Sequence, residues 1–297
     1  MWKHLSSATT TLNLPLPSLL SAFLAAACSL AVDPARPQCT TSLDCSSALA
    51  GSACVDALCE TKPEWTCLAS GESATESVSD QRALREGTLE VTLPTLDMIG
   101  REPVADLVGS VCQKLDVNCA APLAQVNSDA AGNFSLVLDP SFDGYIQLDD
   151  ASRVPVLYFV GPLTPGETLP PLTLLDPSSM SALVSEVDAE LRANHGIALF
   201  TTQDCLGGYS EGIRYQSANA DADTVAFYAA DGLPSIAAAA TDATGYGGFI
   251  NLPAGAAQVT GWFAAGAQPL ASTSVLIRER SITQGRITPV APSRAPL

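Results

Sequence analysis

Short apolar runs of strand length occupy much of the chain from residue 87 onward, and turn residues separate them. The runs are GTLEVTL (87–93), PVADLVGSVC (103–112), NFSLVLD (133–139) and GYIQLDD (144–150). Gly, Pro, Asp and Asn stand between them. Strands at short spacing with turn signals between them are typical of a β-sandwich. The pattern therefore predicts a first β-sandwich domain over residues 86–175.

One phrase occurs twice, as SDAAGNFSLVLDP (128–140) and as TDATGYGGFINLPAG (241–255). The corresponding residues are Asp129 and Asp242, Gly132 and Gly245, and Phe134 and Phe249. Asp and Gly favour a tight turn, since Gly tolerates a positive φ, and the aromatic residue then anchors the next strand in the core. The repetition predicts a second copy of the same β-sandwich over residues 197–290.

A helical pattern lies between the two predicted sandwiches. Asp176 is a favourable N-cap, and Pro177 suits the first helical position. The residues that fall on one helical face are Met180, Leu183, Val184, Val187 and Leu191. Asn194 and Gly196 are stop signals. The sequence predicts a linking helix over 176–195 whose apolar face packs on a β-module. A membrane-surface helix is not expected, because the polar face carries acidic rather than basic residues.

The amino terminus has the features of an export signal. Lys3 precedes an apolar run of ten residues, SLLSAFLAAA (18–27), which is too short to span a bilayer. We expect a signal peptide over 1–27 and a spacer over 28–38. LAAAC resembles a bacterial lipobox, which implies that Cys28 carries lipid and, with Ser29 after it, an outer-membrane or cell-surface location. The alternative is ordinary signal cleavage before Cys28, which would leave the protein periplasmic or secreted.

Cysteine parity supports the same interpretation. The chain has nine Cys, and removing Cys28 leaves eight. These are Cys39, Cys45, Cys54, Cys59, Cys67, Cys112, Cys119 and Cys205. The segment 39–67 is too small for a hydrophobic core, so we expect disulfides to stabilise it in an oxidising compartment. It has no Cys-x-x-Cys pair and no His, so a zinc site is not expected.

Connectivity follows only in part from spacing. Cys112 and Cys119 suit the two arms of a hairpin, which leaves Cys67 and Cys205 to join the Cys-rich segment to the second sandwich. The other four cysteines permit three connectivities, and the sequence does not choose among them.

Charge and composition exclude some functions. The net charge is −17 and no Lys/Arg cluster offsets it, so nucleic-acid binding is not expected. Hydrophobic residues make up 47% of the chain, which argues against global disorder. We expect only the tail, 291–297, to be frayed.

Candidate catalytic residues are few. The chain has two His, and His4 lies in the predicted signal peptide. His195 stands at the predicted helix end, where a structural role is expected. Without a Gly-x-Ser-x-Gly motif or a second His, we expect no catalytic His, no metal and no cofactor. Carboxylate pairs leave a hydrolase as an alternative; the pairs are Asp149 with Asp150 and Asp221 with Asp223. NADADT (219–224) only partly matches a calcium loop.

Aromatic residues suggest another alternative, a carbohydrate-binding module. Trp262, Tyr246, Tyr209 and Tyr215 could form an exposed platform for a sugar. The competing interpretation places Trp262 and Phe263 on opposite faces of one strand, with one of them in the core.

Several motifs together resemble a known domain family. These are Cys-x-x-Pro (119–122), the Asp-x-x-Gly-x-Phe phrase and Phe-x-Gly-Tyr (142–145), which resemble carboxypeptidase regulatory-like domains. PEWTCL (63–68) after a Cys-rich stretch resembles exported bacterial lipoproteins that carry such domains. The resemblance implies a mainly β protein with two transthyretin-like sandwiches and no catalytic residues. We therefore expect a non-enzymatic surface protein with a structural or adhesive role, whose partners are the membrane through Cys28 and a glycan or surface protein.

Overall fold

The computed structural model describes residues 38–41, 44–45, 51–69, 87–161, 163, 166–230, 232–266 and 268–289. The expected signal peptide, Cys28 and the tail lie outside these residues, as does the expected spacer apart from Gln38. Within the described ranges, no helix has both the length and the apolar character needed to cross a membrane.

The first module is a β-sandwich. Its strands are β3 (Leu89–Asp97), β4 (Val108–Gln113), β5 (Ala124–Asn127), β6 (Asn133–Leu138), β7 (Gly144–Leu148), β8 (Val156–Phe159) and β9 (Leu172–Leu174). One sheet has the order β6-β3-β9, and β5-β4-β7-β8 form one end of a nine-stranded sheet. Strand β3 shows why the sequence folds this way, since Leu89, Val91 and Leu93 alternate with more exposed residues and point into the core.

The second module supplies the other end of the nine-stranded sheet. Its strands are β10 (His195–Thr202), β11 (Ile213–Ser217), β12 (Val225–Ala230), β13 (Leu233–Ser235), β14 (Tyr246–Pro253), β15 (Gly255–Phe263), β16 (Pro269–Ile277) and β17 (Ile282–Ile287). The order β13-β12-β14-β10-β17 continues into β8 of the first module, and β11-β15-β16 form a separate sheet. The protein is therefore mainly β, with a sandwich in each half, as the sequence predicts.

The two modules repeat one strand topology. In the first, β3 pairs antiparallel with β6 and parallel with β9, and β4-β7-β8 are consecutive antiparallel neighbours. In the second, β10 pairs antiparallel with β14 and parallel with β17, and β11-β15-β16 are consecutive antiparallel neighbours. Two departures are that β12 pairs with β14, whereas its counterpart β5 pairs with β4, and that the second module adds β13 beside β12.

The repeated Asp/Gly phrase forms the same turn in both modules. Gly132 and Gly245 have φ of 76° and 68°, and each donates its N–H to the carbonyl of the turn's Asp at 2.9 Å. Strands β6 and β14 begin directly after these glycines, and Phe134 and Phe249 are buried in them. The recurring phrase therefore marks equivalent strands.

A buried threonine secures each turn, which the sequence pattern did not suggest. The N–H of Thr95 in β3 donates to the Gly132 carbonyl at 2.8 Å, and the N–H of Thr202 in β10 donates to the Gly245 carbonyl at 2.9 Å. Their side chains are also buried. The turn and the first strand of each module are thus joined by the same backbone hydrogen bond.

Strand β17 fuses the two sandwiches. It lies between β10 and β8 and runs parallel to both, so that Ile282 is paired with Ile197 on one side and with Val156 on the other. The expected separate domains, 86–175 and 197–290, are therefore not independent bodies joined only by a helix. Parallel pairing of the last strand with the first module places both halves in one continuous sheet.

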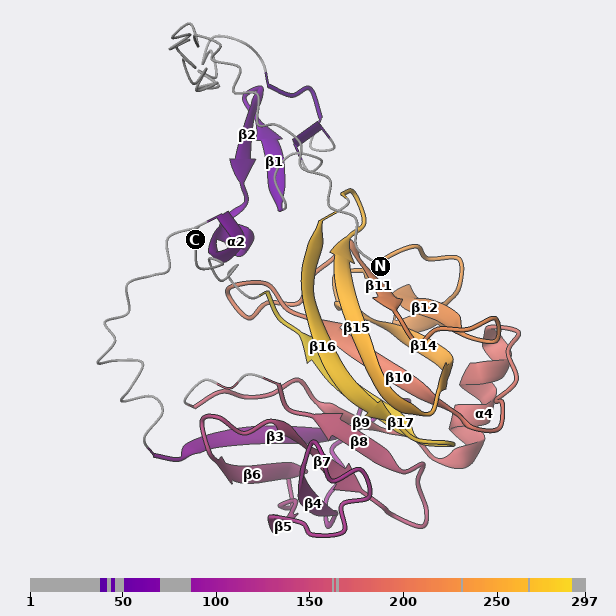
Figure 1. Cartoon of the computed structure of the whole chain (residues 1–297). Helices are drawn as coiled ribbons and strands as arrows, with labels where there is room; N and C mark the ends of the chain where they lie inside the picture. The colour runs from indigo at the N-terminus through magenta and orange to yellow at the C-terminus, as the bar shows by residue number, and fades with distance from the viewer. Residues whose placement is uncertain are drawn as a thin grey trace, which may run out of the picture. The chain divides into compact units, whose positions relative to one another are not determined.

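The small sheets cover opposite faces of the central sheet (Figure 1). Val156 and Tyr158 of β8 belong to the core with β3 and β6, whereas Leu157, which points the other way, belongs to the core with β15 and β16. Neighbouring residues of a strand point to opposite faces, so the two cores lie on the two sides of one sheet.

The polar residues of β17 are all buried and find partners in both modules. Gln284 bonds the backbone N–H of Thr173 in β9 at 3.0 Å and also donates to the carbonyl of the same residue. Arg286 makes an ion pair with Glu167, and its side chain is only 3% exposed. The Thr283 hydroxyl donates to the Leu276 carbonyl of β16 at 2.7 Å.

The linking helix is shorter than predicted. Helix α4 spans Pro177–Glu186, and the Asp176 side chain caps it by accepting from the N–H groups of Ser178 and Ser179. The expected extent, 176–195, was wrong at its C-terminal end. Beyond Asp188, which has φ of 51°, the chain leaves the helix, and Leu191 packs on the core from outside it.

A buried asparagine explains this early stop. Asn251 of β14 is 3% exposed. Its side chain accepts from the N–H of Arg192 at 2.9 Å and donates to the carbonyl of Glu190 at 2.8 Å. These bonds satisfy the N–H of Arg192 and the carbonyl of Glu190 outside the helix, so a tertiary contact overrides the helical pattern. His195 accordingly begins β10 and does not end a helix.

The Cys-rich segment is a small hairpin that docks on the second module. It contains β1 (Ser52–Val55), β2 (Leu58–Thr61), the 3-10 helix η1 (Pro63–Trp65) and α2 (Thr66–Ala69). Its disulfides are Cys39–Cys54, Cys45–Cys59 and Cys67–Cys205. Trp65 is buried, and its ring packs edge-on against Phe263 at 4.9 Å between centroids.

The fourth disulfide, Cys112–Cys119, lies in the first module. The pattern had placed its cysteines in the two arms of a hairpin. Cys112 is in β4, but Cys119 lies in the loop that precedes β5, with φ of 50°.

Gly245→Ala and Gly132→Ala should each destabilise the protein. A Cβ at Gly245 would lie 2.6 Å from the Thr202 carbonyl oxygen, and one at Gly132 would lie 2.9 Å from the Val104 nitrogen. Positive φ alone costs Ala about 1–3 kcal/mol. Gly207→Ala is the control, since Gly207 has φ of 82° but no atom within 4 Å of the added Cβ. Urea unfolding should show larger losses for the two turn variants than for the control, and equal losses would contradict the shared turn.

Candidate functional site

A hollow in the second module lies at the edge strand β11, beside Trp262 of β15. Its volume is about 530 Å³. The polar residues that line it are Gln216, Ser217, Thr224, Gln258 and Thr260. Strand pairing places Gln216 opposite Thr260, so these side chains share the outer face of the small sheet.

Trp262 stands on that outer face, half-buried, while Phe263 points into the core. Trp262 and Phe263 therefore lie on opposite faces of β15, with Phe263 in the core. Arg214 is the cross-strand partner of Trp262, and its guanidinium carbon lies 6.0 Å from the indole centroid. Neither the indole N–H nor the Arg214 Nε has a hydrogen-bond partner in the part of the chain that the structure describes.

This arrangement combines one aromatic face with amide and hydroxyl groups. Gln258, Thr260 and Trp262 follow one another at every second position of β15, so the strand period alone places them on one face. The strand period is thus the sequence signal that identifies Gln258 and Thr260 as companions of Trp262. A sugar presents both hydroxyls and apolar ring faces, and is the class of ligand that such a hollow suits.

Of the other expected platform residues, Tyr215 also lines this hollow but is buried, whereas Tyr246 and Tyr209 do not line it. Tyr215 is 4% exposed, and its hydroxyl is 2.8 Å from the Thr202 hydroxyl and 3.0 Å from the Gly245 carbonyl. Its burial raises the pKa of this hydroxyl. Tyr246 belongs to β14 of the central sheet, where its ring lies 6.2 Å from that of Tyr209. Trp262 and Tyr246 therefore do not form one platform, because they belong to different sheets.

His195 joins the start of β10 to the loop before β12. Its Nδ1 lies 2.7 Å from the Ala193 carbonyl oxygen, and its Nε2 lies 3.1 Å from Asp221 Oδ2. Because both nitrogens face acceptors, the imidazole fits this site best when it carries both protons. The hydrogen bond to Ala193 and the carboxylate of Asp221 raise the pKa of His195. Neither nitrogen is turned toward a nucleophile.

One carboxylate of each candidate pair serves a local turn. Asp150 Oδ1 accepts from the N–H and the hydroxyl of Ser152, both at 2.7 Å, and the Ser152 bonds lower its pKa. Asp221 Oδ1 accepts from the N–H of Asp223 and of Thr224 at 3.0 and 3.1 Å. None of the four carboxylates lines the hollow beside Trp262. His195, Asp221 and Asp223 could together approach a cation, but their contacts are accounted for by the turn and the ion pair.

The His195–Asp221 pair should make stability depend on pH. The folded-state pKa of His195 is raised above its value of 6.5, so its contribution is complete below about pH 6.5 and is lost as pH rises through the folded pKa. Urea unfolding of the wild type between about pH 6 and pH 9 should show this fall, and His195→Gln should remove it. Asp221→Asn should flatten the curve as well, and parallel curves for wild type and His195→Gln would refute the assignment.

Comparison with known proteins gives only distant matches. No protein-family model matches the chain, and no curated protein does. Among solved structures, the Bacillus anthracis TIE protein matches with 16% identity and a TM-score of 0.24, covering 69% of this chain and 35% of that one. The shaft pilin SpaA of Lactobacillus rhamnosus GG has 11% identity, a TM-score of 0.24 and coverage of 69% and 99%. GBS52, the minor pilin of Streptococcus agalactiae, has 11% identity, a TM-score of 0.22 and coverage of 70% and 99%. The chain spans about a third of the TIE protein, and TM-scores of this size do not establish a shared fold.

Proposed function

We propose that the protein is a non-enzymatic, exported surface protein with a structural or adhesive role, held to a membrane by lipid on Cys28. The observation that supports this role most strongly is the fusion of two like sandwiches through β17. A continuous sheet with a core on each face resists bending between its halves, which suits a spacer or a scaffold that presents a surface. The carboxypeptidase regulatory-like resemblance fits the same role.

Export is supported by the cysteines. The eight cysteines that follow Cys28 form four disulfides. Disulfides of this kind persist in oxidising compartments and are rare in reducing ones. Cys67–Cys205 joins residues 138 positions apart, so it ties the segment nearest the proposed anchor to the second module. A lipid anchor at Cys28 would then be joined to the second module through the Cys67–Cys205 disulfide.

The anchor can be tested in a bacterium that expresses the full chain. Wild-type protein should incorporate a fatty-acid label, sediment with membranes and be accessible to antibody on intact cells. Cys28→Ser should lose the label and move to the soluble fraction, because nothing then holds the chain to the bilayer, whereas Ser29→Ala should remain anchored. Cells that display the wild type should adhere to a test surface better than cells with Cys28→Ser. An unlabelled wild type, or equal adhesion of the two, would refute the anchored adhesive role.

A second candidate function is carbohydrate binding in the hollow beside Trp262. It is favoured by the half-buried indole and by the amides of Gln216 and Gln258 that line the same hollow. Stacking of a sugar on the indole, with hydrogen bonds to these amides, would use each group in its ordinary way.

A glycan array tests this candidate. If it is correct, purified wild type binds a limited set of glycans, and Trp262→Ala reduces binding to the same set by about tenfold or more, the effect of losing one well-packed aromatic contact. Tyr209→Ala is the matched control, since Tyr209 is a half-exposed aromatic residue that does not line this hollow. Absence of glycan binding by the wild type, or equal binding by Trp262→Ala, would rule the candidate out.

A further inference from the structure

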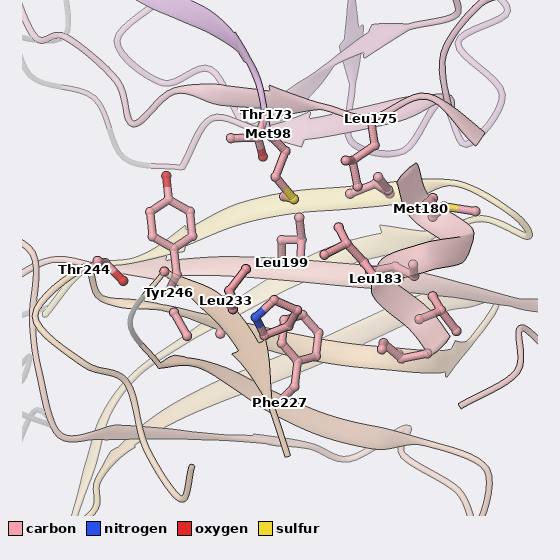
Figure 2. A pocket seen from close by; sticks show the side chains of 18 of the residues that line it. Met98, Thr173, Leu175, Met180, Leu183, Leu199, Phe227, Leu233, Thr244 and Tyr246 are labelled. Carbon is pink, nitrogen blue, oxygen red and sulfur yellow. The ribbon is translucent and has the colours of Figure 1, made fainter. Parts of the chain in front are cut away.

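An apolar cavity of about 150 Å³ lies on the face of the second module's central strands that the sheet β11-β15-β16 does not cover (Figure 2). Leu199 of β10, Phe227 of β12 and Ile250 of β14 line it from the central sheet, and Met180 and Leu183 line it from α4. A cavity of this volume with aliphatic and aromatic walls accepts about one benzene ring, or roughly six carbon atoms. Its walls therefore suit a short apolar group.

A buried hydroxyl in this cavity lacks a partner. Thr173 Oγ1 has no hydrogen bond among the described residues, and Thr173 is 3% exposed. The backbone of this residue is held in place, because the side chain of Gln284 bonds both its N–H and its carbonyl. Figure 2 shows the hydroxyls of Thr173 and Tyr246 toward the end of the cavity away from Met180 and Leu183. A buried hydroxyl that lacks a hydrogen-bond partner and borders an apolar space indicates a ligand with one polar end.

Arg101 gives that polar end its charge. It lines the cavity, its side chain is exposed, and it makes no ion pair within the described part of the chain. Tyr246 lines the same cavity; burial raises the pKa of its hydroxyl, and the Arg101 charge lowers it. None of the described residues that line the cavity is acidic, although the chain has a net charge of −17. The local field therefore favours an anion.

We propose that the cavity binds a monocarboxylate with an apolar tail of about six carbon atoms. The tail lies against Leu199 and Phe227, and the carboxylate pairs with Arg101 and accepts a hydrogen bond from Thr173. Leu233 is 67% exposed and also lines the cavity, so the ligand enters from solvent beside it without separating any strands. The site is distinct from the hollow beside Trp262 and does not depend on the proposed surface role.

Methionine NMR tests this proposal directly, with hexanoate as the probe. Met98 and Met180 are two of the chain's three methionines, and both line the cavity. In the full-length protein labelled at its methionine methyl groups, hexanoate should shift both signals with one saturable curve. Hexylammonium has the same tail with the opposite charge, and acetate has the same head without the tail. Both should bind much more weakly.

Variants separate the head from the tail. Arg101→Gln should weaken hexanoate binding about fivefold, as expected for a partly exposed ion pair. Arg280→Gln, at an arginine that is 79% exposed and does not line the cavity, should leave binding unchanged. Leu183→Trp should fill the space and abolish binding. Thr173→Val keeps the shape of the side chain but removes the unpaired hydroxyl. It should therefore raise the melting temperature of the free protein and weaken hexanoate binding.

Several results would overturn the proposal. The proposal fails if hexanoate shifts neither methionine signal, or if hexylammonium binds as tightly as hexanoate. It also fails if Arg101→Gln binds hexanoate with unchanged affinity. If Leu183→Trp fails to fold, the comparison of hexanoate with hexylammonium on the wild type still decides the question.

Discussion

The parallel pairing of β17 with β8 and β10 is the contact on which the rest of the structure depends. Without it, each sandwich would keep its own small sheet, but the central sheet would divide between β17 and β8. All six residues of β17 are buried, and three of them carry polar side chains that find partners in β9, in β16 and at Glu167. A buried arginine is stable only when it is paired. The strand therefore fits at this one place, between the two modules.

Local differences between the two modules, which otherwise share their strand pairing, accompany the two cavities. Both modules keep the same pairing of their first strand and the same Gly turn held by a buried Thr, at Gly132 with Thr95 and at Gly245 with Thr202. They differ where β12 leaves the small sheet and pairs with β14. That move leaves β11 as an edge strand beside the hollow at Trp262, and it places Phe227 in the apolar cavity on the opposite face. One rearrangement thus shapes both candidate sites.

The sequence predicts the local features of this fold and the long-range pairing of Cys67 with Cys205, but not the contacts that join the two modules. Alternation in β3, the repeated turn at Asp129 and Asp242, and the cap at Asp176 all follow from neighbouring residues, and each is present. The helix end and the fusion of the modules depend on partners far away in the chain, such as Asn251 bonding Glu190 and Ile282 pairing with Val156. Of the candidate site residues, Trp262 could be found by type, but Thr173 and Arg101 come to line one cavity only through tertiary packing.

Hydrogen exchange under increasing denaturant, read by mass spectrometry, tests most directly whether β17 makes one cooperative body of the two sandwiches. If it does, peptides from β8, β10 and β17 exchange with the same free energy and the same denaturant dependence, because none of them opens before the whole sheet does. If peptides from β3 to β8 become exchangeable at lower denaturant while β10 and β17 stay protected, the modules unfold separately, and the central claim is contradicted.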